Sequence, residues 1–478
     1  MPAAQLSARR LVDLLSDYPS TRPAYRALAN AVRGVLVDGR VTHQTRLPSE
    51  RELSVALGVS RTTVTRAYGE LVDSGWATAR RGSGTTLVLR GRDHTGGESL
   101  IPPDAEDGVI NLMIAAPPAP PGTMDAVERA VALLPARLTG HGYRMSGDPL
   151  LREQIAAHYD DRGLPTDPEQ IIVTPGALAA TAVVVRMLIG RGDRAIMETP
   201  SYPNSVETLR AGGARVVGLP VSAAGWDAEA FEATIRQTAP RFALLIPDFQ
   251  NPTGALMDAE TRDRFGTVLA RTRTIGVADE TMADLPIDPL TMPPPFAASN
   301  PDVITIGSIS KAFWGGFRIG WLRVPTSLHD RVVQARTSLD LGCSLADQLI
   351  AYEMFTHRDT LLGERREALR ESRDVLVSEL RDRLSDWEFT TPRGGMTLWA
   401  RMPEPVASAV VLAAERHGLL LASGGQFGVD QDLRHYIRLP FAAPADVLRE
   451  GVDRLARAYA DAIAEPTLVR ERAGSFIA

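Results

Sequence analysis

The sequence has 478 residues, a net charge of −6, 44% hydrophobic residues and 23% charged residues. This length is large for one compact core and predicts two or three domains. No stretch approaches the ~20 uninterrupted apolar residues of a membrane-spanning helix, and the N-terminus lacks the basic-then-apolar pattern of a signal peptide. The single cysteine excludes an internal disulfide. We therefore expect a globular cytoplasmic protein with no membrane partner, and we predict no metal site.

Charge is distributed unevenly along the chain. Residues 1–90 contain 13 arginines and 7 acidic residues, a net charge of +6, so the remainder carries −12. A basic segment on an acidic protein indicates an anionic partner for that segment alone.

The basic segment contains the signals of three helices and a hairpin. Residues 23–40 have apolar side chains at helical spacing. A second helix is predicted after Ser49, which forms a capping box with Glu52. A third helix is predicted to begin at the N-cap residue Ser60. Residues 76–89 then alternate around a Gly-Ser-Gly turn, which predicts a two-stranded hairpin.

Elements in this order predict a winged helix-turn-helix whose third helix enters the DNA major groove. Side chains suited to base edges and phosphates gather at the start of that helix: Arg61, Thr62, Thr63, Thr65 and Arg66. Arg80 and Arg81, at the tip of the hairpin, would bring charge to the DNA backbone or minor groove. Any one of these side chains could simply be a solvated surface residue. The order of cap, turn, Arg-Thr-Thr start and basic wing favours DNA binding.

The stretch LPSERELSVALGVSRTTVTRAYGELVDSGWATARRGSGTTLV resembles the GntR family of bacterial regulators. The resemblance implies double-stranded DNA as a partner. The DNA contacts that it implies are Arg51, Arg61, Thr62, Thr63, Thr65, Arg81 and Gly82.

Residues 91–108 are rich in Gly, Pro and charge and lack periodicity, which predicts a linker between domains 1–90 and 109–478. Beyond it, strand-like runs alternate with helical segments, a pattern that predicts a largely parallel sheet in an α/β domain. The runs are QIIVTPG, RAIMETP, ARVVGLPV, FALLIPD, TIGVADE and VITIGSISK. From about residue 345, long helical segments and the strands GMTLWARM and HYIRLPF predict a smaller α+β lobe.

Lys311, in the stretch GSISKAF, is the only lysine among the 52 basic residues. A buried lysine, unlike an arginine, can lose its proton, and the neutral amine forms a Schiff base with an aldehyde. Pyridoxal 5'-phosphate (PLP) is the common aldehyde cofactor. The alternative is a surface lysine without a role, and the surrounding residues bear on the choice.

Several neighbouring segments offer phosphate donors. The strand that ends at VTPG turns at Gly176 and opens a helix, so the amides of Ala177 and Leu178 would form an anion site. Further phosphate donors are available near the lysine: Ser308, Ser310 and Arg318.

Three other residues suit the pyridine ring of the cofactor. Asp279 could keep the pyridine nitrogen protonated, Asn251 could donate to the ring oxygen, and Tyr202 could stack on the ring. Taken singly, Asp279 could cap a helix, Asn251 could serve a turn and Tyr202 could belong to the core. All of them follow strand-like runs of one α/β unit, which favours a common site.

Residues 109–465 resemble the fold-type I aminotransferases, through GDPLLREQIAAHY, ETPSYPN, PDFQNPTG, DE, GSISKAFWGGFRIGW and YIRLPFA. The resemblance assigns the Schiff base to Lys311 and the substrate carboxylate to Arg438, and it supports the cofactor roles above. It also matches Tyr143 to a tyrosine that reaches the phosphate from the neighbouring subunit. Leu178 stands where many relatives have a polar residue. Thr281 stands where relatives have a tyrosine that contacts the ring oxygen, which puts efficient catalysis in doubt.

A GntR-like unit joined to an aminotransferase-like domain is the architecture of the MocR group. The resemblance implies a PLP-binding transcription regulator that forms a head-to-tail homodimer. Three hypotheses follow: a regulator that senses PLP or an amino compound reacting with it, a genuine aminotransferase with a DNA-binding domain, or a regulator with a cofactor-free domain. The basic segment favours the first over the second. The retained Lys311, Asp279 and Asn251 argue against the third.

Overall fold

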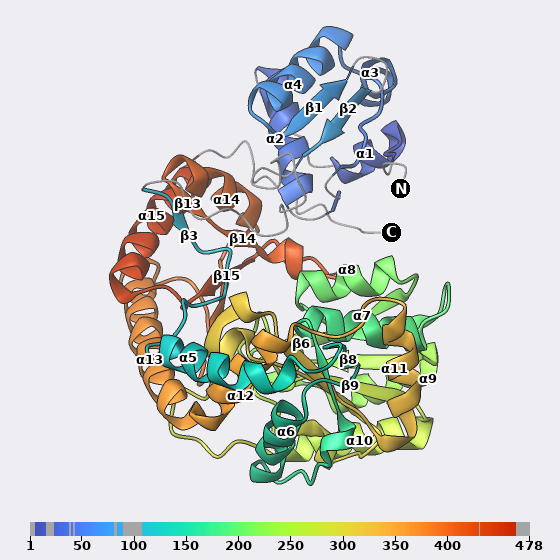
Figure 1. The fold of residues 1–478 in the computed structure, drawn as a ribbon. Coiled ribbons are helices and arrows are strands. Elements are labelled where there is room, and N and C mark those ends of the chain that lie inside the picture. Colours follow the sequence, from blue (N-terminus) through green and yellow to red (C-terminus); the bar gives the residue numbers. More distant parts are fainter. Residues whose placement is uncertain are drawn as a thin grey trace.

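The computed structural model of the protein describes residues 5–15, 23–37, 40–41, 44–80, 84–88, 108–429 and 431–464. The described chain has three parts (Figure 1). They are a winged-helix unit at the N-terminus, a large lobe built on a central sheet, and a smaller lobe that contains the last described helix. The predicted linker lies almost entirely outside the described residues.

The described residues of the winged-helix unit form four helices followed by an antiparallel hairpin. Its elements are α1 (Ala8–Leu14), α2 (Ala24–Val37), α3 (Glu50–Leu57), α4 (Arg61–Asp73), β1 (Ala77–Arg80) and β2 (Gly84–Leu87). The capping box of Ser49 and Glu52 is present, and the helix it starts ends at Gly58 in the left-handed conformation. The predicted elements are thus confirmed, and α1 is an additional helix that the sequence reasoning did not identify.

The large lobe contains an eight-stranded sheet in the order β4-β11-β10-β9-β8-β5-β6-β7. In chain order the strands are β4 (Ile171–Thr174), β5 (Arg194–Thr199), β6 (Arg215–Ser222), β7 (Gly225–Trp226), β8 (Phe242–Leu245), β9 (Ile275–Asp279), β10 (Ile304–Ser308) and β11 (Gly320–Arg323). All six predicted runs are strands of this sheet. The run from β10 to β6 is parallel, as predicted, whereas β11 is antiparallel to both of its neighbours.

Helices cover both faces of this sheet (Figure 1). Alternate residues of a strand enter different clusters: Ile171 and Val173 pack in one, and Ile172 packs in the other. This alternation explains why the strands read as continuous apolar runs. The helices of the lobe are α5 (Thr123–Leu133), α6 (Pro149–Asp161), α7 (Ala177–Leu188), α8 (Pro203–Ala211), α9 (Ala228–Thr238), α10 (Ala259–Thr272), α11 (His329–Thr337) and α12 (Leu345–Thr356).

The smaller lobe packs three long helices around short strands. Its helices are α13 (Arg358–Arg383), α14 (Ala407–Arg416) and α15 (Ala445–Ala464), and its strands are β3 (Ile110–Asn111), β12 (Thr397–Arg401), β13 (Leu419–Leu420), β14 (Ala422–Ser423) and β15 (Tyr436–Pro440). Strands β12, β15 and β14 form an antiparallel sheet, which confirms the predicted α+β lobe. β3 pairs with β13, so the start of the C-terminal domain belongs to the smaller lobe.

The winged-helix unit contacts the smaller lobe of its own chain. Ser423 Oγ, which is fully buried, donates to the carbonyl oxygen of Val37 at 3.1 Å. Helix α2 also packs against α14. In the described part of the chain, no helix combines the length and apolarity needed to cross a bilayer.

Candidate functional site

Several of the predicted cofactor residues follow the carboxyl ends of parallel strands, where α/β folds place their ligands. Asp279 is the last residue of β9, and Ser308 ends the adjacent β10. Asn251 follows β8, and Tyr202 follows β5. Because these strands run parallel, the four residues come to one edge of the sheet.

Lys311 lies in a single π-helical turn, η4 (Ser310–Trp314), directly after β10. Its Nζ donates to the carbonyl oxygen of Ala115 at 2.8 Å. The pKa of Lys311 is lowered to about 8, mainly by burial and also by the charge of Arg438, while Asp279 acts in the opposite direction. The amine is therefore partly neutral near pH 8, which suits a nucleophile.

The predicted phosphate donors surround the start of α7. Gly176 has φ +91°, and a Cβ at that position would lie 2.6 Å from Arg318 Nη2. Gly320 has a similar role, since its Cβ would lie 2.8 Å from the amide nitrogen of Ala177. Ser308 Oγ donates to Ser310 Oγ at 3.0 Å. Two glycines thus let an arginine and a strand approach a helix N-terminus, a cradle that fits a phosphate.

Asp279 is buried, and burial raises the pKa of its carboxyl group. The amide of Thr281 donates to Asp279 Oδ1 at 3.1 Å, and the Thr281 side chain also bonds to this carboxyl. These hydrogen bonds, with the charge of Lys311, lower the pKa and oppose the effect of burial. In this chain Thr281 therefore contacts the carboxylate, a role that sequence reasoning did not identify.

Asn251 lies in a loop that is fixed by the hydrogen bonds of its neighbour Gln250. Gln250 donates to Glu198 Oε2 at 3.2 Å and to the Pro200 carbonyl at 2.8 Å. Glu198 is fully buried, and burial raises its pKa to about 7. Asn251 Oδ1 is buried without a hydrogen-bond partner among the described residues. This amide oxygen is an acceptor and fits a ligand group that donates, whereas the predicted donation to the ring oxygen would come from the Asn251 amide nitrogen and remains a prediction.

Arg438 projects from β15 into an aromatic surrounding, with its guanidinium 5.0 Å from the centre of the Phe427 ring. It donates to the carbonyl oxygen of Met113, whereas its buried Nε has no partner within the described residues. Burial lowers the pKa of Arg438 to about 10. A buried guanidinium with spare donors suits a carboxylate.

The two predicted tyrosines differ in exposure. The hydroxyl of Tyr202 accepts a hydrogen bond from Asn204 at 2.8 Å, and burial raises its pKa. Tyr143 is 64% exposed and packs beside His141. The proposed stacking and cross-subunit roles of these tyrosines remain predictions.

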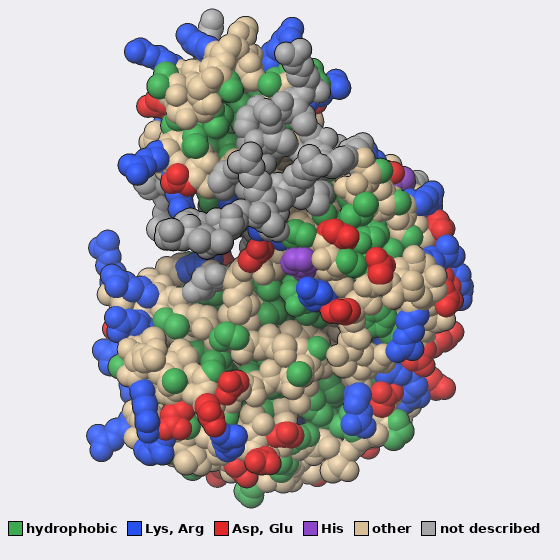
Figure 2. All heavy atoms as spheres, turned by 180° about the vertical axis from the view of Figure 1, so that it is seen from behind, with side chains coloured by type: hydrophobic (Ala, Val, Ile, Leu, Met, Phe, Trp, Pro, Cys, Tyr) green, Lys and Arg blue, Asp and Glu red, His purple; other side chains and the backbone are tan. Residues whose placement is uncertain are grey.

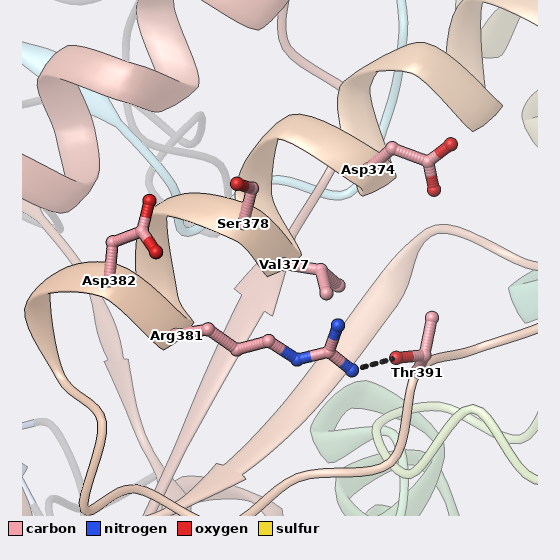
Figure 3. Close-up of a pocket in the computed structure, with 6 residues that line it drawn as sticks. All are labelled: Asp374, Val377, Ser378, Arg381, Asp382 and Thr391. Carbon is pink, nitrogen blue, oxygen red and sulfur yellow. Dashed lines mark hydrogen bonds between the residues drawn. The ribbon is translucent and has the colours of Figure 1, made fainter.

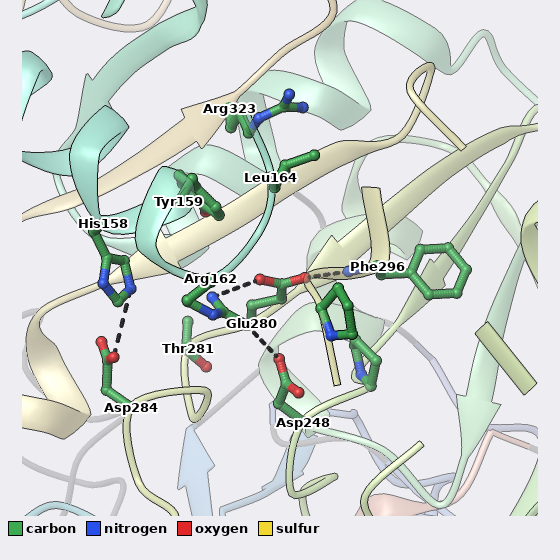
Figure 4. Close-up of polar contacts among 12 residues, drawn as sticks. His158, Tyr159, Arg162, Leu164, Asp248, Glu280, Thr281, Asp284, Phe296 and Arg323 are labelled. Carbon is green, nitrogen blue, oxygen red and sulfur yellow. Dashed lines mark hydrogen bonds and ion pairs between the residues drawn. The ribbon is translucent and has the colours of Figure 1, made fainter. Parts of the chain in front are cut away.

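A buried ionic network surrounds Glu280 (Figure 4). Arg162 lies between two carboxylates, with Nη1 3.0 Å from Glu280 Oε2 and Nη2 3.5 Å from Asp248 Oδ2. The amide of Phe296 donates to the other Glu280 oxygen at 2.8 Å. These bonds hold Glu280, the residue after Asp279, and so fix the end of β9. The network has no signal in the local sequence pattern.

On the winged-helix unit, most of the predicted DNA contacts are exposed: Arg51, Arg61, Thr62, Thr65 and Arg66. Basic side chains predominate among its charged groups on the face drawn in Figure 2. Thr63 is only half-exposed, and its hydroxyl lies 2.8 Å from Ser60 Oγ at the helix cap. Arg81 and Gly82 lie outside the described residues.

Within this unit, the Glu50 carboxylate interacts with two of the side chains that are predicted to contact DNA. Thr65 Oγ1 donates to Glu50 Oε2 at 2.8 Å, and Arg61 Nε lies 3.6 Å from the same oxygen. DNA that reaches these side chains competes with an acidic group.

A hollow of about 310 Å³ is lined by residues of α13 and by Thr391 (Figure 3). Arg381 Nη2 donates across it to Thr391 Oγ1 at 3.3 Å. None of the predicted site residues lines it.

Two parts of the chain match known protein families. Residues 108–455 match the family described as aminotransferase class I and II. The chain belongs to this family. Residues 24–87 match the family of bacterial regulatory proteins named gntR. The chain thus combines a GntR-type helix-turn-helix with an aminotransferase-like domain of a PLP-dependent family, as the resemblances implied.

Individual relatives include both enzymes and regulators. A 2-aminoadipate transaminase of Thermus thermophilus is 28% identical over 61% of this chain and 75% of its own length. The probable rhizopine catabolism regulatory protein MocR of Rhizobium meliloti is 29% identical over 84% of this chain and 86% of its own. The crystal structure of LysN, the α-aminoadipate aminotransferase of Thermus thermophilus complexed with N-(5'-phosphopyridoxyl)-L-leucine, matches with a TM-score of 0.68 and 26% identity. That match covers 75% of this chain and 94% of LysN.

Proposed function

We propose that the protein is a DNA-binding transcription regulator whose aminotransferase-like domain binds PLP and responds to PLP itself or to an amino compound. The observation that carries the proposal is the placement of the only lysine. Lys311 lies beside Asp279 and Arg438 in a chain that also has a GntR-type unit.

The chain's own residues have distinct roles in this proposal. The α7 amides, with Ser308, Ser310 and Arg318, would hold the phosphate. Asp279, supported by Thr281, would keep a proton on the pyridine nitrogen. PLP supplies an aldehyde that reacts with amines and a ring that withdraws electrons from them.

In this proposal, Arg438 selects ligands that have a carboxylate beside the amine. Its guanidinium donates to the Met113 carbonyl, and its Nε, which has no partner in the described part of the chain, could donate to a further acceptor. A carboxylate offers two acceptors in the geometry of the guanidinium, so we expect amino acids to bind better than amines of the same shape.

A homodimer is part of the proposal, because apolar side chains of the large lobe are exposed on adjoining segments. The exposed residues are Met124, Val131, Leu138, Tyr143, Leu339 and Leu341. Arg336 joins the segment of Leu138 and Tyr143 to the segment of Leu339 and Leu341. Its Nη1 donates to the Met145 carbonyl at 2.7 Å. A second copy of the chain would bury these side chains.

A genuine aminotransferase is the alternative, favoured by the retention of Lys311, Asp279, Asn251 and Arg438. The test is to titrate purified protein with PLP, following the visible absorption band, and then to assay turnover with a panel of amino acids and 2-oxoglutarate. The regulator proposal expects PLP binding, DNA binding above nonspecific levels and little turnover. Efficient turnover without sequence-specific DNA binding would favour the enzyme.

A further inference from the structure

Arg365, on α13, is a buried arginine whose described hydrogen bonds all go to backbone carbonyls. It is 7% exposed. Its Nη2 donates to Phe313 at 2.9 Å and to Pro118, and its Nε donates to Ala312 at 3.4 Å. Burial lowers its pKa to about 10, and no carboxylate contributes to that shift.

This situation differs from that of Arg373 on the same helix. Arg373, eight residues further along α13, is equally buried and pairs with Asp288 at 2.8 Å. Burying a guanidinium without an ionised partner is costly, because the charge loses its hydration. Burying Arg365 therefore has a high free-energy cost if its only role is to join the Pro118 backbone to that of Ala312 and Phe313.

The carbonyls that Arg365 binds belong to two segments that flank Lys311. Ala312 and Phe313 directly follow the lysine in the π-helical turn η4, a single turn whose geometry departs from that of a regular α-helix. The planar fork of Arg365 supplies donors to two successive carbonyls of this turn. The direction in which the turn presents Lys311 depends on those bonds.

The third acceptor, Pro118, ends a segment that crosses the site, which we call the 113–118 segment. Its Met113 carbonyl accepts from Arg438, and its Ala115 carbonyl accepts from Lys311. The two groups assigned to cofactor and ligand thus bind this segment at one end and at its middle. Arg365 binds its other end, at the Pro118 carbonyl.

We propose that Arg365 is a positioning residue that fixes the turn of Lys311 and the 113–118 segment relative to each other. The relevance to cofactor binding rests on the function proposed above, whereas the effect on Lys311 itself does not. The competing explanation is that Arg365 merely joins α13 to the large lobe and has no specific effect on the lysine.

The single lysine allows a direct test without cofactor. The rate of Lys311 acetylation is measured against pH by peptide mass mapping in the wild type, Arg365→Met, Arg365→Lys and the matched control Arg373→Met. PLP affinity and the thermal midpoint are measured on the same four proteins.

We expect Arg365→Met to shift the Lys311 midpoint from about 8 towards the ordinary value of 10.5 and to weaken PLP binding about tenfold or more. Arg365→Lys should be intermediate, because one ammonium cannot span three carbonyls. Arg373→Met should lower the thermal midpoint but leave both Lys311 readouts unchanged.

Equal Lys311 midpoints and PLP affinities in Arg365→Met and Arg373→Met would overturn the proposal. If Arg365→Met does not fold, the same comparison is made with Arg365→Lys. A Lys311 midpoint and a PLP affinity equal to those of the wild type in that variant would overturn the proposal. A wild type that fails to bind PLP would refute the proposed function, yet the shift of the acetylation midpoint would still test Arg365.

Discussion

Lys311 Nζ donates to the carbonyl oxygen of Ala115 at 2.8 Å, although the two residues are 196 positions apart in the chain. The bond ties the site lysine to the 113–118 segment, which follows β3 of the smaller lobe. Two lobes therefore meet at the only lysine of the chain, whose pKa is lowered to about 8.

The first prediction concerns the protonation of Lys311. Its pKa is lowered to about 8 from 10.5, so the neutral, reactive form appears at a lower pH than for an ordinary lysine. Acetylation of Lys311, read by peptide mass mapping, should be half-maximal near pH 8. In urea the midpoint should return towards 10.5, and the N-terminal amine serves as an internal reference. A midpoint near 10.5 in the folded protein would contradict burial of the amine.

The second prediction concerns Asp279. Asp279→Asn removes the charge that would hold a proton on the pyridine nitrogen, so PLP binding should weaken by about 1.5–3 kcal/mol, the value of a charge-assisted hydrogen bond. Thr281→Val should weaken PLP binding less, because it removes only a hydroxyl bonded to Asp279. Spectroscopic titration with PLP measures both. Wild-type affinity in Asp279→Asn would remove Asp279 from the site.

The third prediction separates cofactor from ligand. Arg438→Met should leave PLP binding within a few-fold of wild type and abolish discrimination between an amino acid and its decarboxylated amine. L-leucine and 3-methylbutylamine form one such pair, and the change of the PLP absorption band reports each. Loss of PLP binding with retained preference for the amino acid would reverse the assignment.

The fourth prediction tests the head-to-tail dimer. The Val37 carbonyl accepts from Ser423 within one chain. In a head-to-tail dimer the corresponding contact would form between chains. Oxidation of a Val37→Cys, Ser423→Cys protein in a Cys343→Ser background should then give a cross-linked dimer on non-reducing gels. A cross-linked monomer would contradict the head-to-tail arrangement, and sedimentation would show whether the protein is still a dimer.

Much of the fold could be predicted because its signals are local. The capping box at Ser49 and the apolar runs of the sheet depend on neighbouring residues alone. The antiparallel β11 and the pairing of β3 with β13 depend on contacts distant in sequence, so no periodicity reveals them.

The site divides in the same way. Lys311 and Asp279 stand in motifs that follow strands, so their types and order indicated the chemistry. Arg365 lies among charged residues of α13, in the stretch ERREALRESR, where it looks like a solvated side chain. Only the packing of α13 against η4 brings it to the lysine.

The last prediction tests DNA recognition by the exposed start of α4. Arg61 stands where the recognition helix meets base edges, so Arg61→Ala should cost about 1–3 kcal/mol on a specific site and relax discrimination there. Arg51 is exposed on α3, the helix that crosses the DNA backbone in this fold. Arg51→Ala should weaken binding to all duplexes and reduce the salt slope by about one.

Glu50 provides the matched test of the same surface. It accepts from Thr65 and lies 3.6 Å from Arg61, so DNA must displace an acidic group to reach either side chain. Glu50→Gln removes a negative charge from the interface and should tighten binding to every duplex. The measurement is binding of a duplex from the gene's own upstream region and of a random duplex across a salt series. If Arg61→Ala and Glu50→Gln both leave these isotherms unchanged, α4 is not the DNA-reading helix.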